Sequence, residues 1–255
     1  GFFYSIQLAE GGKNVSLQFI IGSSGIGKTH YACEQIIRES MENPQHLYYI
    51  IVPEQFTMQT QKNVVEMHPG KGILNIDVLS FQRLAYRIFE ETGGAREVLL
   101  DDTGKSMVLQ KLVQQHRKNL PYLGSQMNKP GYLDEVKSLI SEFMQYDIRE
   151  EELQDMLGKT GEDSLLHMKM QDVGVLYQAF LQYLEGHYMT GEGVMDALKK
   201  AIPFSDKLKK SVLLLDGFTG FTPVQMNVIR ELLNVCDKVL VPEAPGTDTI
   251  GYSPL

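Results

Sequence analysis

Apolar residues along the chain form two kinds of pattern, short continuous runs and stripes at helical spacing. The continuous runs cover residues 17–22, 47–52, 73–79, 211–215 and 238–241. The helix-spaced stripes follow such runs at residues 30–42, 81–91 and 223–235. Strands that are buried on both faces have continuous apolar runs, and their alternation with helices is typical of a parallel sheet. The pattern therefore predicts an α/β fold with a parallel sheet.

The middle of the chain has a different pattern. Apolar residues there recur only at helical spacing, as in Met107, Leu109, Leu112 and Val113, and no run has the character of a strand. We therefore predict that an all-helical insertion, residues 97–204, interrupts an α/β domain formed by residues 16–96 and 205–255. Residues 1–15 are interpreted as an N-terminal extension, and a start at Gly1 suggests a trimmed or engineered end.

Composition narrows the class of protein. The chain is 43% hydrophobic and 22% charged, which is ordinary for a globular protein, and its apolar runs are too short to span a membrane. The net charge of −8 argues against a protein that coats nucleic acid, although it permits a local basic groove. Two cysteines cannot form a disulfide scaffold, and residues 1–15 do not resemble a secretory leader. These features predict a cytoplasmic location.

A complete phosphate-binding motif, G-x-x-x-x-G-K-[ST], follows the first apolar run. It comprises Gly22, Ser23, Ser24, Gly25, Ile26, Gly27, Lys28 and Thr29. Glycines allow backbone N–H groups to turn toward phosphate oxygens, and the following helix contributes free amides and its dipole. We expect Lys28 to reach the β- and γ-phosphates of ATP and Thr29 to bind Mg²⁺. The alternative is a glycine-rich turn with an incidental lysine.

A second magnesium ligand is expected at the end of another strand. Four apolar residues, 212–215, are followed by Asp216, which is the form that an acidic metal ligand takes beside such a loop. The alternative is an ordinary Asp-Gly turn that ends the strand. Since Lys28 and Asp216 are separated in sequence by the helical block, the fold has to bring them together.

Four stretches of the chain resemble one protein family. They are residues 16–22 leading into the motif, Val52-Pro53-Glu54-Gln55-Phe56-Thr57, residues 78–87, and Asp216-Gly217-Phe218-Thr219-Gly220-Phe221-Thr222-Pro223. UvrD/Rep-like helicases hold a helical domain between the loop and the acidic strand. Within that group, the stretches resemble the AddB (RexB) subunit of ATP-dependent helicase–nucleases that process double-strand DNA breaks.

The resemblance implies a role for the chain and a set of partners. The chain would be the N-terminal, RecA-like P-loop motor domain with its 1B-like helical insertion, in a protein of the bacterial cytoplasm. It would bind ATP, Mg²⁺ and DNA, as single strands and duplex ends, and it would form a heterodimer with a helicase–nuclease A subunit. The second motor half and a nuclease with an iron–sulfur cluster would lie beyond residue 255.

One position departs from active helicases, which carry Asp-Glu at the acidic strand. Here the pair is Asp216-Gly217, so the glutamate that prepares the attacking water is missing. The resemblance also implies that an arginine from the second motor half completes an active site. We therefore assign no catalytic residue and expect a degenerate motor.

The resemblance further implies that segments after the second and third strands contact single-stranded DNA. The candidate residues are Gln55, Thr57, Ser80, Phe81, Gln82 and Arg83. Polar side chains would bond phosphate or sugar, Phe81 would stack on a base, and Arg83 would pair with phosphate. In the alternative interpretation, Phe81 belongs to the apolar core stripe of its helix and Arg83 is solvated.

Other interpretations remain open at this point. Lys199, Lys200, Lys207, Lys209 and Lys210 form a cluster that is either a phosphate-binding surface or a solvated face. Two alternative hypotheses concern the whole chain. In one it is an autonomous P-loop kinase that acts on a small acceptor, and in the other it is an interaction module whose phosphate loop is a relic. Nucleotide binding separates the relic from the other hypotheses, and phosphotransfer to a small acceptor identifies a kinase.

Overall fold

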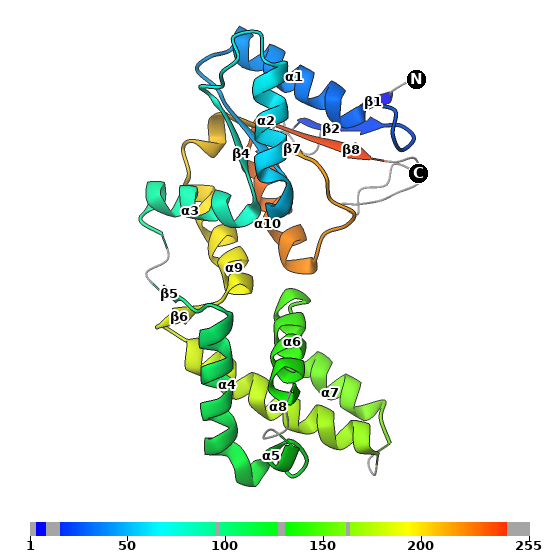
Figure 1. Cartoon of the computed structure of the whole chain (residues 1–255), viewed down its shortest axis with the longest axis vertical. Coiled ribbons are helices and arrows are strands. Elements are labelled where there is room, and N and C mark those ends of the chain that lie inside the picture. Colours follow the sequence, from blue (N-terminus) through cyan, green and yellow to red (C-terminus); the bar gives the residue numbers. More distant parts are fainter. Residues whose placement is uncertain (1–3, 9–15, 95–96, 127–130, 162–163, 244–255) are drawn as a thin grey trace. The chain divides into compact units, whose positions relative to one another are not determined.

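The computed structural model describes residues 4–8, 16–94, 97–126, 131–161 and 164–243. The chain divides into two compact units, one formed by residues 1–94 and 195–255 and the other by residues 95–194. Figure 1 shows the chain passing from the α/β unit into the helical unit and back again. The sequence pattern placed these boundaries at 96/97 and 204/205.

The α/β unit is built on a six-stranded sheet with the order β1-β2-β8-β7-β3-β4. The strands are β1 (Tyr4–Leu8), β2 (Ser16–Ile21), β3 (Leu47–Ile51), β4 (Ile76–Leu79), β7 (Ser211–Leu215) and β8 (Lys238–Glu243). All neighbouring pairs are parallel except β1 and β2. The prediction of a mixed α/β fold with a parallel sheet is confirmed. Within the N-terminal extension predicted for residues 1–15, residues 4–8 pair with β2 as an edge strand, which periodicity had not indicated.

Helices cover both faces of this sheet. They are α1 (Lys28–Glu42), α2 (Thr57–Met67), α3 (Phe81–Thr92) and α10 (Pro223–Val235). The α/β unit also contains 3₁₀ turns η1 (Glu54–Phe56), η3 (Ile202–Phe204) and η4 (Leu208–Lys210), and helix α9 (Gly191–Ala201) crosses the boundary between the units. Leu213 and Leu214 point to opposite faces of β7, and both are fully buried. The continuous apolar runs in the sequence follow from this two-sided burial.

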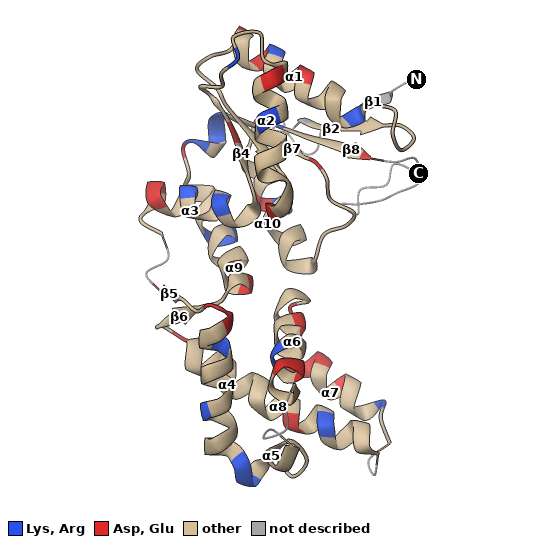
Figure 2. Ribbon diagram, in the orientation of Figure 1, with Lys and Arg blue, Asp and Glu red and all other residues tan. Residues whose placement is uncertain are grey.

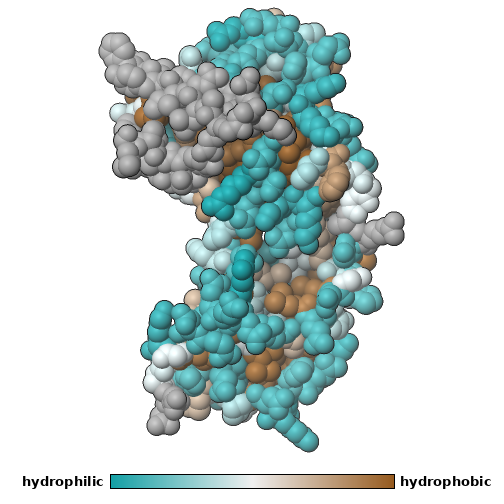
Figure 3. All heavy atoms as spheres, turned by 180° about the vertical axis from the view of Figure 1, so that it is seen from behind, coloured by the Kyte–Doolittle hydropathy of each residue, from teal (hydrophilic) through white to brown (hydrophobic). Residues whose placement is uncertain are grey.

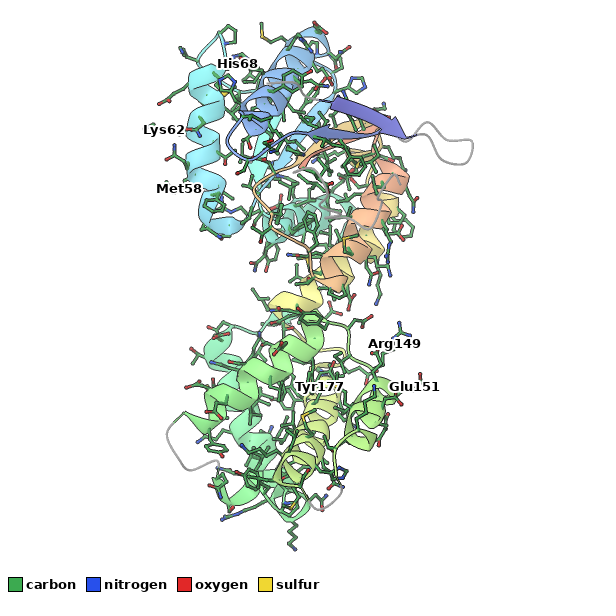
Figure 4. All side chains as sticks on the ribbon, turned by 90° about the vertical axis from the view of Figure 1, so that its right-hand side faces the viewer. Met58, Lys62, His68, Arg149, Glu151 and Tyr177 are labelled. Atoms are coloured by element: carbon green, nitrogen blue, oxygen red, sulfur yellow. The ribbon has the colours of Figure 1, made fainter. Side chains whose placement is uncertain are left out.

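Helix α2 was missing from the sequence prediction. Only Thr57 and Val64 of its residues are buried, so the helix shows too few apolar positions to produce a periodic signal. Figure 4 shows Met58 and Lys62 on the outside of α2 and His68 at its end. By contrast, α10 begins at Pro223, as predicted, because Thr222 and Gln225 form a reciprocal capping box.

The second unit is a helical bundle with its own core. It contains α4 (Asp102–His116), η2 (Arg117–Asn119), α5 (Leu123–Gln126), α6 (Tyr132–Gln145), α7 (Glu150–Gly158) and α8 (Leu165–Leu184). Leu109, Ile140, Leu176 and Phe180 pack together at its centre. Tyr177, labelled in Figure 4, donates a hydrogen bond of 3.1 Å to the carbonyl oxygen of Ile148.

The prediction that this block contains no strand is wrong in one place. β5 (Val98–Leu99) and β6 (Tyr188–Met189) form a two-stranded parallel sheet within the helical unit. Each strand has two residues, which is too short to produce an apolar run, and both residues of β5 are exposed. Tertiary pairing alone therefore creates this element.

Among the described residues, no helix combines the length and apolar character needed to cross a membrane. The face shown in Figure 3 is mainly hydrophilic over both units, with separate hydrophobic patches.

The helical unit contains one buried carboxyl group with a structural role. Asp172 of α8 is fully buried, and its Oδ2 accepts the backbone N–H groups of Tyr122 and Leu123 at 2.9 and 2.7 Å. Oδ1 has no hydrogen-bond partner among the described residues. Burial raises the pKa of Asp172 above its usual 3.8, although the two N–H donors act in the opposite direction.

Replacement of Asp172 by alanine is expected to lower the free energy of unfolding by about 3 kcal/mol, because two buried N–H groups lose their acceptor. Since the folded state binds the proton more tightly, stability from the carboxyl group is present below pH 3.8 and is lost as pH rises through the raised pKa. Asp172→Asn keeps an acceptor, so it should cost less and flatten this pH dependence. Urea unfolding between pH 3 and 8 measures both effects, and equal losses in the two variants would contradict this role.

Candidate functional site

The glycine-rich loop, residues 22–29, connects the end of β2 to α1. Gly25 and Gly27 have φ angles of 79° and 91°, in the left-handed region that residues with a side chain rarely adopt. The N–H of Gly22 donates to the carbonyl oxygen of Glu243 at 3.1 Å, which ties the start of the loop to β8. The glycines at these positions therefore make the conformation of the loop possible.

Lys28 lies against the beginning of the same loop. Its Nζ donates hydrogen bonds to the carbonyl oxygens of Gly22 and Ser23 at 2.6 and 2.8 Å. Residues 23–27 are exposed, so the loop is open to a ligand from solvent. The ammonium group and the first amides of α1 together form a positive site, which is suited to phosphate.

Asp216 is brought to this loop by the strand order. It follows β7, which is separated from β2 by a single strand, β8. The Thr29 hydroxyl donates to Asp216 Oδ1 at 2.9 Å, although the two residues are 187 positions apart. Because the carboxyl ends of parallel strands meet at one edge of the sheet, the two sequence-predicted metal ligands are in contact.

The Asp216 carboxyl group is buried beside donors. Burial raises its pKa above the usual value, whereas the Thr29 hydroxyl, the Gly217 N–H and the Lys28 charge act to lower it. A hydroxyl oxygen next to a carboxylate oxygen is a donor set of the kind that Mg²⁺ prefers. The side chains that the structure places here therefore fit magnesium chemistry.

The position after Asp216 cannot easily hold a catalytic side chain. Gly217 has a φ of 77°, and a Cβ atom there would lie 3.5 Å from Pro53 Cδ and 3.7 Å from Phe56 Cδ2. The space is sufficient, but the backbone conformation is strained for any other residue. Two other buried acids lie elsewhere: Asp172 accepts backbone N–H groups in the helical unit, and Glu243 ends β8.

Comparison with known proteins identifies the family. Residues 19–243 match the family model described as ADDB, N-terminal. The chain belongs to the AddB family. Curated relatives are named as the B subunit of an ATP-dependent helicase/deoxyribonuclease. That of Lachnoclostridium phytofermentans is 45% identical over 89% of this chain and 20% of the relative. That of Alkaliphilus metalliredigens is 34% identical over 86% of this chain and 19% of the relative. The chain thus spans about a fifth of the length of the AddB relatives that it matches.

The DNA-facing candidates of this AddB chain fall into exposed and buried groups. Gln55, Gln82 and Arg83 are exposed, and Arg83 forms an ion pair of 2.9 Å with Glu54. Thr57 and Ser80 are buried. The Thr57 hydroxyl donates to the Glu54 carbonyl oxygen at 2.9 Å, and Ser80 Oγ accepts the Arg83 N–H at the start of α3. The ion pair and these hydrogen bonds fix η1 and the beginning of α3 in place.

Phe81 is also buried, with 5% of its surface exposed. Its ring lies 5.6 Å from that of Phe218 and 6.3 Å from that of Phe221, measured between centroids. In this conformation the ring is a core residue of α3, as in the alternative interpretation, and is not open to stack on a base. Phe218 and Phe221 were not singled out individually from the sequence, although they lie in the stretch 216–223 that resembles the family. Phe56, which is exposed, also lies in such a stretch and has no individual sequence signal.

Proposed function

We propose that this chain is the N-terminal nucleotide- and DNA-binding part of a helicase–nuclease subunit that acts in double-strand break repair and recombination. The contact of 2.9 Å between Thr29 and Asp216, beside Lys28 and the glycine-rich loop, is the observation that carries the proposal. Family membership and the parallel strand order support a RecA-like P-loop arrangement for the α/β unit.

The loop residues have separate roles in this proposal. Backbone amides of residues 23–29 and the Lys28 ammonium would bind the phosphates of ATP, while Thr29 and Asp216 would hold Mg²⁺. Bound magnesium would neutralise charge on the β- and γ-phosphates. Calorimetry of the folded chain with Mg·ATP tests the nucleotide part, and the absence of binding would favour an interaction module with a relic loop.

The relatives are named as one subunit of an enzyme, which supports a place in a larger assembly. We propose that the partner is a helicase–nuclease A subunit and that the complex works on DNA ends in the bacterial cytoplasm. A nuclease with an iron–sulfur cluster would belong to the part of the protein that lies outside residues 1–255. With Gly217 beside Asp216, residues 1–255 would bind ATP and contribute little hydrolysis.

Single-stranded DNA is expected to bind weakly and with a strong dependence on salt, because most contacts would be to phosphates. The exposed residues Gln82 and Arg83 would supply polar contacts beside η1. Replacing both by alanine should weaken binding about ten-fold, since hydrogen bonds to charged groups contribute about 1.5–3 kcal/mol. Fluorescence anisotropy with a labelled oligothymidine measures the affinity at several salt concentrations.

A control separates DNA contact from loss of the Arg83–Glu54 ion pair. Glu54→Gln removes the same ion pair but leaves Arg83 in place, so it should retain or improve DNA binding. Phe81→Ala is a separate test of the stacking prediction, with thermal unfolding as a check on the core. A Gln82 and Arg83 double variant that binds as tightly as the wild type would contradict the proposed surface.

A further inference from the structure

The segment of residues 199–210 carries an unusual concentration of positive charge. It contains five lysines and one acidic residue, Asp206, in a chain whose net charge is −8. It includes the end of α9 and the turns η3 and η4, which lead directly into β7. Figure 2 shows the blue positions on α9 and on the turn before β7. We call it the lysine segment.

The backbone of the lysine segment is fixed by buried residues at a spacing of three. Ile202, Ser205 and Leu208 are fully buried, as is Ser211 at the start of β7. The Ser205 hydroxyl donates to Glu91 Oε2 at 2.6 Å, and the Lys207 N–H donates to Glu91 Oε1 at 3.0 Å. Because the inner residues are anchored in this way, the outer side chains are presented from a well-defined backbone.

The outer residues are an aromatic ring and several cations. Phe204 is 74% exposed, so most of its ring surface is accessible to a ligand. Lys207, Lys209 and Lys210 are exposed. Lys209 pairs with Asp206 at 2.8 Å, whereas Lys207 and Lys210 form no ion pair with another described residue. The segment therefore presents one exposed aromatic ring and two lysines, Lys207 and Lys210, that form no ion pair with another described residue.

This surface is distinct from the nucleotide site in the same unit. The lysine segment precedes β7, whereas the glycine-rich loop, Asp216, η1 and the start of α3 follow the carboxyl ends of their strands. A strand of five residues such as β7 separates the two edges by about 16 Å, at 3.3 Å per residue. A ligand on the lysine segment would thus not occupy the site described above.

We propose that the lysine segment is a second binding surface for single-stranded DNA, with Lys207 and Lys210 on phosphates and Phe204 stacked on a base. Lysine is depleted in protein–protein interfaces, so its abundance here favours phosphate over a protein partner. Unspecific single-strand sites combine a positive surface with exposed aromatic rings, and both features are present. The inference rests on the proposed function only in taking DNA as the ligand.

The test uses the whole chain and a labelled oligothymidine, with Lys207→Gln plus Lys210→Gln as one variant and Phe204→Ala as another. Lys62→Gln plus Lys118→Gln, which removes two exposed lysines elsewhere, is the matched control. We expect the first variant to reduce the slope of log affinity against log salt by about 1.4, or 0.7 for each lost phosphate contact, with no change for the control. Phe204→Ala should weaken binding at least about five-fold, given the usual strength of stacking on a base.

Duplex DNA of the same length and heparin serve as additional probes. The Phe204→Ala loss should be confined to the single strand, because the bases of a duplex are already stacked. Equal losses of affinity in Phe204→Ala for single strand, duplex and heparin would overturn the proposal. A salt slope that changes as little in the Lys207 and Lys210 variant as in the control would also overturn it. If Gln82→Ala with Arg83→Ala weakens binding while the lysine variant does not, the lysine segment is excluded and the proposed function stands.

Discussion

Replacement of Lys28 by alanine is expected to weaken Mg·ATP binding at least about ten-fold. The ammonium group lies over the glycine-rich loop at 2.6 and 2.8 Å from two loop carbonyl oxygens, so it is placed to exchange these partners for phosphate oxygens. Hydrogen bonds to a charged group contribute about 1.5–3 kcal/mol, which corresponds to a ten-fold effect or more. Isothermal titration calorimetry with Mg·ATP and with ADP measures it.

Lys62→Ala is the matched control for this experiment. Lys62 is an exposed lysine of α2 whose ion pair with Glu66 spans 3.8 Å, so the change removes the same charge away from the loop. The control should bind Mg·ATP as tightly as the wild type, and thermal unfolding should show that both variants are folded. Equal affinity of Lys28→Ala and wild type for Mg·ATP would contradict the hypothesis that this loop binds phosphate.

ATP hydrolysis by this chain alone is expected to stay near background, with or without single-stranded DNA. A general base typically contributes about 10²–10⁴-fold, and the position after Asp216 is a glycine. An arginine finger contributes about 10³–10⁵-fold, and the resemblance to helicases implies that it comes from a second motor half outside this chain. Phosphate release under saturating Mg·ATP measures the rate. Turnover of several per second that is lost in Lys28→Ala would contradict a degenerate motor.

The same experiment should show that Gly217→Glu does not restore hydrolysis. The backbone at Gly217 has a φ of 77°, and that conformation costs a residue with a side chain about 1–2 kcal/mol. The variant is therefore expected to be less stable than wild type and equally inactive. Gly217→Ala carries the same backbone strain without a carboxylate, so it separates the loss of stability from any gain in activity.

Periodicity predicted most of the elements that bury an apolar face. Residues 211–215 and 223–235 have the bounds that the pattern indicated, because β7 is buried on both faces and α10 begins with its own cap. The pattern failed where an element buries little. Helix α2 has two buried residues, and β5 has none, so neither produces a signal.

The residues of the candidate site can be picked out from the sequence alone. The motif from Gly22 to Thr29 and the acid after an apolar strand are local patterns, and each depends only on neighbouring residues. The sequence also shows a glycine, Gly217, after Asp216, which is the basis for the prediction that a helicase-like site here would lack its usual base. The family resemblance followed from such local stretches, and the match over residues 19–243 agrees with it.

Tertiary structure was needed to establish which of these residues meet and which are exposed. The order β2-β8-β7 brings the Thr29 hydroxyl to Asp216 across 187 positions, a contact that no local pattern contains. Burial likewise separated exposed Arg83 from buried Phe81, although both lie in the first turn of α3. Both results have the same cause. A side chain's partners and exposure depend on packing between distant elements, whereas its chemical type and the local backbone preference are fixed by its own position in the chain.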